Sequence, residues 1–177
     1  YEFAQRDRVM SELVATTRRL ARQAAAANIG FNIDAEEQAR LDLSLDVIAA
    51  VLSDDALKGW DGFGVVVQAY GRRALDLIDW LEALAERFDR RIMVRLVKGA
   101  YWDTEIKLAQ TLGLPGFPVF TRKAATDVSY IACARRLLAA RRIYPQFATH
   151  NAHTVAAVLH LARETGNSSD AFEFQRL

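Results

Sequence analysis

The stretch RLVKGAYW places two cations, Arg95 and Lys98, at the end of an apolar run. They are followed by Gly99 and by two aromatic residues, Tyr101 and Trp102. Paired cations suit phosphate groups or an electron-rich ring, and aromatic side chains beside them pack against a ring. These residue types indicate a site for an anionic or ring-shaped ligand where a buried strand ends.

Polar side chains also end the other apolar runs of the chain. They are Asp34, Gln68, Thr121 with Lys123, Thr149 with His150 and Asn151, and Gln175. Because the carboxyl ends of parallel strands lie on one side of a sheet, we expect these groups to lie near Arg95 at that end of the sheet, which we call the mouth.

Helices and strands that alternate along the chain are expected to position these groups. Stretches with the apolar periodicity of a helix alternate with short apolar runs typical of buried strands. The predicted helices cover 6–27, 35–52, 71–88, 102–112, 125–140 and 152–164. The predicted strands cover 31–34, 64–68, 92–96, 117–121, 146–149 and 172–177. Six helix–strand pairs in strict alternation predict an α/β fold with a parallel sheet and crossover helices.

The position of the glycines favours a barrel over a doubly wound nucleotide fold. The only close pair, Gly62 and Gly64, precedes its strand and lacks the third glycine of a dinucleotide fingerprint. A closed (βα)8 barrel of the TIM type needs eight strands, so about two strand–helix units are expected outside this chain. We therefore predict that residues 1–177 are part of one barrel domain from which pieces are missing.

Composition narrows the class of protein further. The 177 residues are 51% apolar, and 23 basic residues nearly balance 22 acidic ones, so bulk attraction to nucleic acid is not expected. A single cysteine, Cys133, excludes an internal disulfide and fits a reducing compartment. No segment has the pattern of a signal peptide or of a membrane span, so the sequence predicts a cytoplasmic protein.

Several of these residues also have a purely structural interpretation. Asp34 opens Asp-Ala-Glu-Glu, a capping-box pattern typical of a helix start. Arg95 could pair with Asp34 as a structural bridge. His150 and His153 flank the start of a helix that Asn151 would cap, which is simpler than a zinc site, and no metal is expected.

Three functions remain open on the residues alone. In the first, Arg95 and Lys98 tune a ring cofactor. In the second, Lys98 or Lys123 forms a Schiff base in a lyase or aldolase. In the third, the chain is a non-catalytic barrel fragment that oligomerises through its sheet edges.

Four stretches together resemble the proline dehydrogenase family, in order and with compatible spacing. They are NIDAEE (32–37), VQAY (67–70), RLVKGAYWD (95–103) and YPQFATHNAHT (144–154). The resemblance extends to Thr121–Lys123 and to the terminal segment 172–177. Within the family, the chain is most similar to the proline dehydrogenase domain of the bifunctional bacterial proline utilization A (PutA) enzymes.

The resemblance implies a distorted barrel that binds FAD and oxidises L-proline to Δ1-pyrroline-5-carboxylate, passing electrons to a membrane quinone. It places Arg95 by the reactive edge of the flavin, with Asp34 close to both. The residues that it assigns to FAD are Gln68, Arg95, Lys98, Gly99, Ala100, Trp102, Thr121, Lys123, Thr149, His150 and Asn151. Those that it assigns to the proline pocket are Asp34, Tyr101 and Leu177.

Two substrate-binding features of the family have no counterpart in this sequence. They are a pair of arginines on the last barrel helix, which bind the proline carboxylate, and a lysine on the first strand. We therefore expect activity only within a longer polypeptide, which in the PutA branch also carries an aldehyde dehydrogenase domain. The same branch implies peripheral contact with the inner membrane when the flavin is reduced.

Overall fold

Five parallel strands form one sheet, in the order β1-β2-β3-β4-β5, in the computed structural model, which describes residues 3–176. The strands are β1 (Phe31–Ile33), β2 (Phe63–Gln68), β3 (Ile92–Val97), β4 (Ile143–Ala148) and β5 (Glu173–Gln175). Since strand order follows chain order and every pair is parallel, all carboxyl ends lie at one edge of the sheet, as expected.

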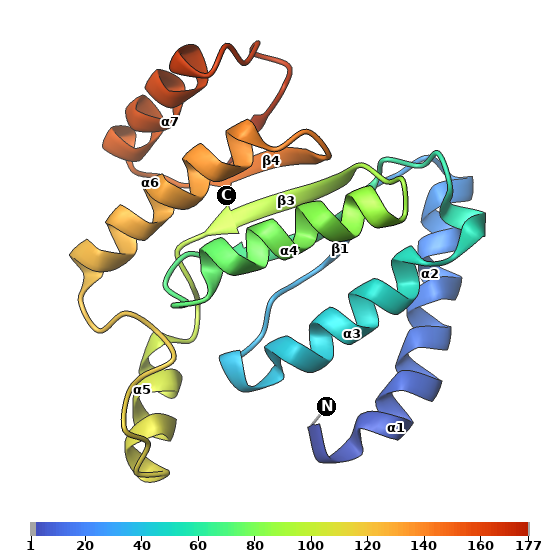
Figure 1. Cartoon of the computed structure of the whole chain (residues 1–177), viewed down its shortest axis with the longest axis horizontal. Coiled ribbons are helices and arrows are strands. Elements are labelled where there is room, and N and C mark those ends of the chain that lie inside the picture. The colour runs from blue at the N-terminus through green and yellow to red at the C-terminus, as the bar shows by residue number, and fades with distance from the viewer. Residues whose placement is uncertain (1–2, 177) are drawn as a thin grey trace.

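Helices connect the strands. They are α1 (Arg6–Arg8), α2 (Val14–Ala26), α3 (Leu41–Leu52), α4 (Ala74–Arg87), α5 (Trp102–Thr111), α6 (Lys123–Ala139) and α7 (Ala152–Glu164). A π-helical turn, Val9–Leu13, joins α1 to α2, and a 3-10 turn, Gln38–Arg40, precedes α3. In Figure 1, α3, α4 and α6 lie in front of the sheet, whereas α5 stands apart beyond the end of β3.

The two faces of the sheet differ in polarity. In β3, Ile92, Val94 and Leu96 are fully buried against the helices, whereas Met93, Arg95 and Val97 on the other face are half-buried. The strand register places Gln146 of β4 beside Arg95, on that second face. A central strand in an apolar core would be buried on both faces, so this pattern indicates that only the first face packs against the helices, while the second carries the polar side chains of Arg95 and Gln146.

One predicted strand is wrong. Residues 117–121 join no sheet ladder; Val119 forms only an isolated antiparallel bridge with Gly71. Phe120 donates a backbone hydrogen bond to Tyr70, and the carbonyl of Pro118 accepts one from Arg72. The backbone of this apolar run bonds to the turn after β2 instead of to a neighbouring strand, so the run does not pair as a strand. Within the described residues the sheet therefore has five strands, not the six that the sequence predicted.

The predicted helix 35–52 also begins later than expected. Residues 34–37 are not helical, and α3 starts at Leu41. None of the helices between residues 3 and 176 is both long and apolar enough to cross a membrane.

Candidate functional site

An ion pair joins the ends of two non-adjacent strands. Arg95 Nη1 of β3 donates to Asp34 Oδ1, just beyond β1, at 3.0 Å. On its other side, Arg95 Nε donates to Gln175 Oε1 of β5 at 2.8 Å. The guanidinium is thus fixed at two points, and its side chain remains 29% exposed towards the mouth of the sheet. A fixed, partly exposed cation is suited to stabilising negative charge on a ligand.

The hydrogen bonds of Arg95 continue along the inner face of the sheet. Gln175 Nε2 donates to Glu173 Oε1 at 2.7 Å, and Gln146 Nε2 donates to the same oxygen at 2.9 Å. Each side chain in this row holds the next, so the acceptor that faces Arg95 has a defined orientation. Glu173 and Gln146 were not among the residues predicted from sequence.

Asp34 does not cap a helix, so the capping-box prediction is wrong. The 3-10 turn that precedes α3 has no side-chain cap, and neither has α3 itself. The Asp34 carboxylate bonds to Arg95 instead, and 75% of its side chain is exposed. A tertiary contact has here displaced the local one that the sequence favours.

Gln68 bonds to two segments at the end of β2. Its Nε2 donates to the carbonyl of Glu36 at 2.9 Å, and its Oε1 accepts from the Ala100 amide at 3.3 Å. The side chain is only 6% exposed. Each end of the amide thus makes one hydrogen bond within the protein, and Gln68 links the segment after Asp34 to the turn after β3.

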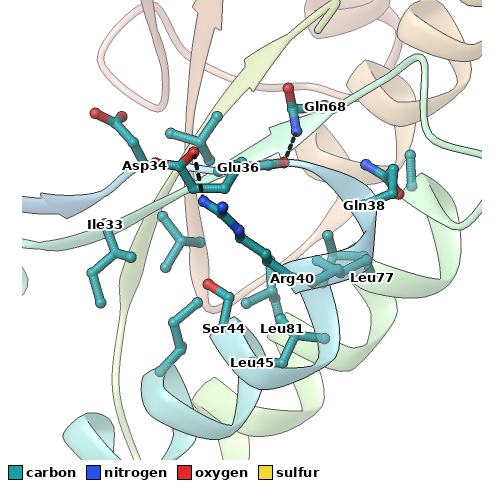
Figure 2. Close-up of a pocket in the computed structure, with 16 residues that line it drawn as sticks. Ile33, Asp34, Glu36, Gln38, Arg40, Ser44, Leu45, Gln68, Leu77 and Leu81 are labelled. Carbon is teal, nitrogen blue, oxygen red and sulfur yellow. Dashed lines mark hydrogen bonds and ion pairs between the residues drawn. The ribbon is translucent and has the colours of Figure 1, made fainter. Parts of the chain in front are cut away.

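A small pocket lies behind the segment 34–36, between α3 and α4 (Figure 2). Its rim is polar, with Asp34, Glu36 and Arg40, and leucines form its floor. Arg40 approaches the Glu36 carboxylate at 3.8 Å (Figure 2). This pocket underlies the segment that presents Asp34 and is separate from the inner face that carries Gln175.

The turn after β3 lies directly on an aromatic ring. Gly99 has φ +138°, and a Cβ atom at this position would come within 2.5 Å of the Tyr70 ring. The Tyr70 amide also donates to the carbonyl of Lys98 at 2.7 Å. A side chain at residue 99 would both strain the backbone and collide with the ring, so the turn requires glycine.

Lys98 and Lys123 meet at one carboxylate. Lys98 Nζ donates to Asp127 Oδ1 at 2.5 Å, and Lys123 Nζ donates to Asp127 Oδ2 at 2.7 Å. The hydrogen bonds from Lys123 and Lys98 lower the pKa of Asp127 below its usual value. Asp127, on an exposed face of α6, thus gathers two predicted cofactor ligands into one cluster.

Trp102 closes the same region. Its Nε1 donates to the carbonyl of Phe120 at 2.9 Å, while 42% of the residue remains exposed. Thr121 follows in the chain and is exposed. The segment 117–121 is thus not a strand, but it still brings Thr121 and Lys123 towards the turn that carries Lys98.

The last predicted group lies beyond β4. Arg95, Thr149, His150 and Gln175 line one open hollow, so Arg95 and the end of β4 share a surface. Asn151 Oδ1 accepts from the Thr154 amide at 3.1 Å and caps α7, which confirms the cap interpretation of this stretch. Within residues 3–176 no three His, Cys, Asp or Glu side chains are grouped as a metal site would require. Leu177 lies outside the described residues.

These polar groups fit the needs of a large anionic ring cofactor. Arg95, Gln68 and the Lys98–Lys123 cluster supply cationic and amide groups along the strand ends, and the Gly99 turn allows close approach of backbone. Sequence reasoning also missed the ion pair between Lys98 and Asp127, which joins residues 29 positions apart. Only the spacing of Lys123 and Asp127, four residues on one helix, was visible beforehand.

Comparison with known proteins gives the same family throughout. A family model described as proline dehydrogenase matches residues 2–177. The bifunctional protein PutA of Salmonella typhimurium is 54% identical over 178 residues, which cover 100% of this chain and 13% of the relative. Proline dehydrogenase 2 of Bacillus subtilis is 32% identical over 149 residues, which cover 84% of this chain and 42% of the relative.

A solved structure has the same fold. A crystal structure of a mutant of Bradyrhizobium japonicum proline utilization A matches with a TM-score of 0.95 and 61% identity, over 99% of this chain and 18% of that one. The prediction of a barrel of the proline dehydrogenase type is thereby confirmed as a fold class. The chain spans less than a fifth of the length of these PutA proteins.

Proposed function

Because the chain belongs to the proline dehydrogenase family, we propose that it forms the flavin-binding part of an enzyme that oxidises L-proline. The observation that carries this proposal is the double anchoring of Arg95, by Asp34 and Gln175, at the mouth of the sheet. We favour a cofactor site over a Schiff-base site, because a Schiff base requires a neutral amine, whereas each candidate lysine is ion-paired with Asp127.

FAD is the cofactor that we assign to this mouth. Arg95 and Gln68 would bind its ring, and Lys98, Gly99, Ala100 and Trp102 would line the ring and its ribityl and phosphate groups. Thr121, Lys123, Thr149, His150 and Asn151 would hold the remainder. When bound, FAD would supply the acceptor for a hydride from the proline carbon beside the nitrogen, while the nitrogen would lose a proton to water, which together would yield Δ1-pyrroline-5-carboxylate.

Arg95 would act electrostatically. Hydride transfer places negative charge at the flavin, and a cation that is already fixed needs no reorganisation to stabilise it. Asp34 and Gln175 restrain the guanidinium from both sides, so its charge stays aimed at the mouth. Asp34 and Tyr101, together with Leu177, would form the wall of the proline pocket contributed by this chain.

The rest of the enzyme would complete the barrel. We propose that residues 1–177 lie within one barrel domain, with further strands and a last helix supplied by the same polypeptide. That polypeptide would provide the arginines for the proline carboxylate and an aldehyde dehydrogenase domain. We place it in the cytoplasm, with a membrane quinone as the electron acceptor of the reduced enzyme.

The test is proline-dependent reduction of an artificial electron acceptor by the protein at its natural length. We expect turnover with L-proline, and a loss of about 100-fold to 1,000-fold in Arg95→Met, the range for removing one preorganised electrostatic group. Arg163→Met, at an exposed arginine of α7, is the matched control and should keep full activity. Absence of proline turnover by the protein at its natural length would contradict the proposed function. Turnover by the isolated 177 residues would contradict the proposal that the rest of the polypeptide must complete the barrel.

A further inference from the structure

A buried carboxylate lies outside the proposed site. Glu105 is in the first turn of α5 and is only 2% exposed. Glutamate is rarely buried without a specific partner, because removing its charge from water is costly. The partner of Glu105 therefore indicates what the residue does.

That partner is a backbone amide in the segment that follows β1. The Gln38 N–H donates to Glu105 Oε1 at 2.6 Å, across 67 residues of sequence. Gln38 begins the 3-10 turn that follows the extended segment 34–37. Glu105 thus holds the far end of the segment whose near end is Asp34.

Tyr101 holds the same segment at a second point. Its hydroxyl donates to Glu36 Oε2 at 3.2 Å, and its carbonyl accepts the Glu105 amide at 2.9 Å. Tyr101 and Glu105 therefore lie one helical turn apart. Tyr101 bonds to Glu36 and Glu105 bonds to Gln38, on either side of Glu37. The third restraint is Gln68, which bonds to the Glu36 carbonyl.

These contacts couple the segment that carries Asp34 to the turn and helix that follow the strand of Arg95. The chain that leaves β3 after Arg95 runs through the Gly99 turn into α5, and α5 fixes residues 36 and 38. Asp34 has 75% of its side chain exposed, so burial does not fix its position. Its direction towards Arg95 depends on how the backbone after it is held.

The surroundings make a carboxylate at this point costly to keep. Burial raises the pKa of Glu105 above its usual value, the Gln38 amide opposes that rise, and the negative charge of Glu37 adds to it. Burial raises the pKa of Tyr70 to about 12, and the negative charge of Glu105 adds to that rise, so the two groups lie close together. A neutral apolar residue would avoid the cost but would leave the Gln38 N–H without its acceptor.

We propose that Glu105 is a positioning residue, which anchors the segment 34–38 from α5 so that Asp34 faces Arg95. Its effect on catalysis rests on the proposed function, whereas its effect on the segment does not. Glu105 would not touch proline or flavin; it would act through the backbone at Gln38 and then through Asp34.

The first measurement is amide hydrogen exchange in the protein at its natural length. Glu105→Ala should speed exchange by about tenfold or more in peptides covering 34–41, with no change in peptides covering 143–148, because local opening is confined to the released segment. Glu105→Gln keeps an acceptor oxygen at the same reach and should restore protection. Asp103→Ala, at an exposed position in the same turn of α5, is the control and should match the wild type.

The second measurement is a double-mutant cycle on proline turnover. Glu105→Ala should lower kcat by about tenfold to 100-fold, the scale of a misplacement remote from the chemistry. In an Asp34→Asn background the same change should cost less than about twofold, since residues that act through one another are not additive. If Glu105 acted on the fold alone and not through Asp34, Glu105→Ala would lower kcat by the same factor in the wild type and in Asp34→Asn.

The outcomes separate the two proposals. Unchanged exchange at 34–41 in Glu105→Ala, or faster exchange spread evenly over the sheet, would overturn the positioning role. If Glu105→Ala does not fold, Glu105→Asp, whose carboxylate is one methylene short of Gln38, decides by the same exchange pattern. A wild-type protein without proline turnover would overturn the proposed function alone, since the exchange result would still decide the role of Glu105.

Discussion

Asp34 and Arg95 are 61 residues apart in sequence, yet their side chains pair at 3.0 Å at the mouth of the sheet. The pair is unequal, because the carboxylate is 75% exposed and the guanidinium only 29%. An exposed ion pair contributes roughly 0–1 kcal/mol to stability, so its value lies in orienting the arginine.

Because the Asp34 carboxylate is mostly exposed, we predict that Asp34→Asn affects activity more than stability. We expect proline turnover to fall by about tenfold to 100-fold as Arg95 loses its charged partner. The opening free energy of β3, from hydrogen exchange, should change by less than about 1 kcal/mol. A large loss of β3 protection with intact turnover would reverse this assignment.

The same variant tests whether Asp34 is a general base, which we regard as a separate hypothesis. A general base contributes about 100-fold to 10,000-fold and leaves its ionisation in the pH dependence of kcat/KM. We predict that Asp34→Asn keeps the wild-type pH profile at a lower rate. Loss of an acidic limb from the profile would instead establish general-base catalysis by Asp34.

Asp127 predicts a pH dependence of local stability. Its pKa is lowered by Lys123 and Lys98, so its stabilising effect is present above the unfolded value of 3.8 and is lost as pH falls through the lower folded value. Because 40% of its side chain is exposed, the effect should not exceed about 1 kcal/mol at neutral pH. Hydrogen exchange of the start of α6 in Asp127→Asn should show this loss at pH 7 and a smaller one below pH 3.8.

Asp61→Asn, at an exposed position before β2, is the control for that experiment. It should leave exchange in α6 unchanged at every pH. Equal protection of α6 in the wild type and Asp127→Asn at pH 7 would show that the two lysine contacts do not stabilise the helix.

Gly99 predicts a sharp sensitivity to a single methyl group. In Gly99→Ala the new Cβ would come within 2.5 Å of the buried Tyr70 ring, at a φ of +138° that alanine disfavours. We expect a destabilisation of about 1–3 kcal/mol, seen as a lower melting temperature, together with weaker retention of flavin. Gly116→Ala, where a Cβ meets nothing within 4 Å, should melt as the wild type does. Equal melting of the two variants would contradict the packing argument.

Cys133 predicts an inert thiol. It is fully buried in α6, and burial raises its pKa to about 11, so little thiolate forms near neutral pH. Iodoacetamide at pH 8 should leave the peptide that contains Cys133 unlabelled in the native protein and label it in urea, as measured by mass spectrometry. Rapid labelling of the native protein would show that α6 opens easily.

Periodicity predicted most elements well where local and tertiary preferences agree. The expected helix 152–164 coincides with α7, and Asn151 caps it as its side chain suggests. It failed at 117–121, where the backbone of an apolar run bonds to Tyr70 and Arg72 in the turn after β2 and joins no strand. An apolar run alone does not specify whether its backbone finds a neighbouring strand.

The site shows the same division. Residues that end strands, such as Arg95 and Gln68, were predictable because parallel strands bring their carboxyl ends together. Glu105 was not predictable, because its position in a helix does not reveal that its carboxylate is buried against Gln38. Contacts between residues this far apart in sequence depend on the packing of α5, which no local pattern encodes.

The most direct test of the proposed function is the visible absorption spectrum of the purified natural-length protein, recorded before and after anaerobic addition of L-proline. The account predicts an oxidised flavin spectrum that bleaches with proline in the wild type and bleaches far more slowly in Arg95→Met. A protein that binds no flavin, or whose flavin stays oxidised at saturating proline, would contradict it.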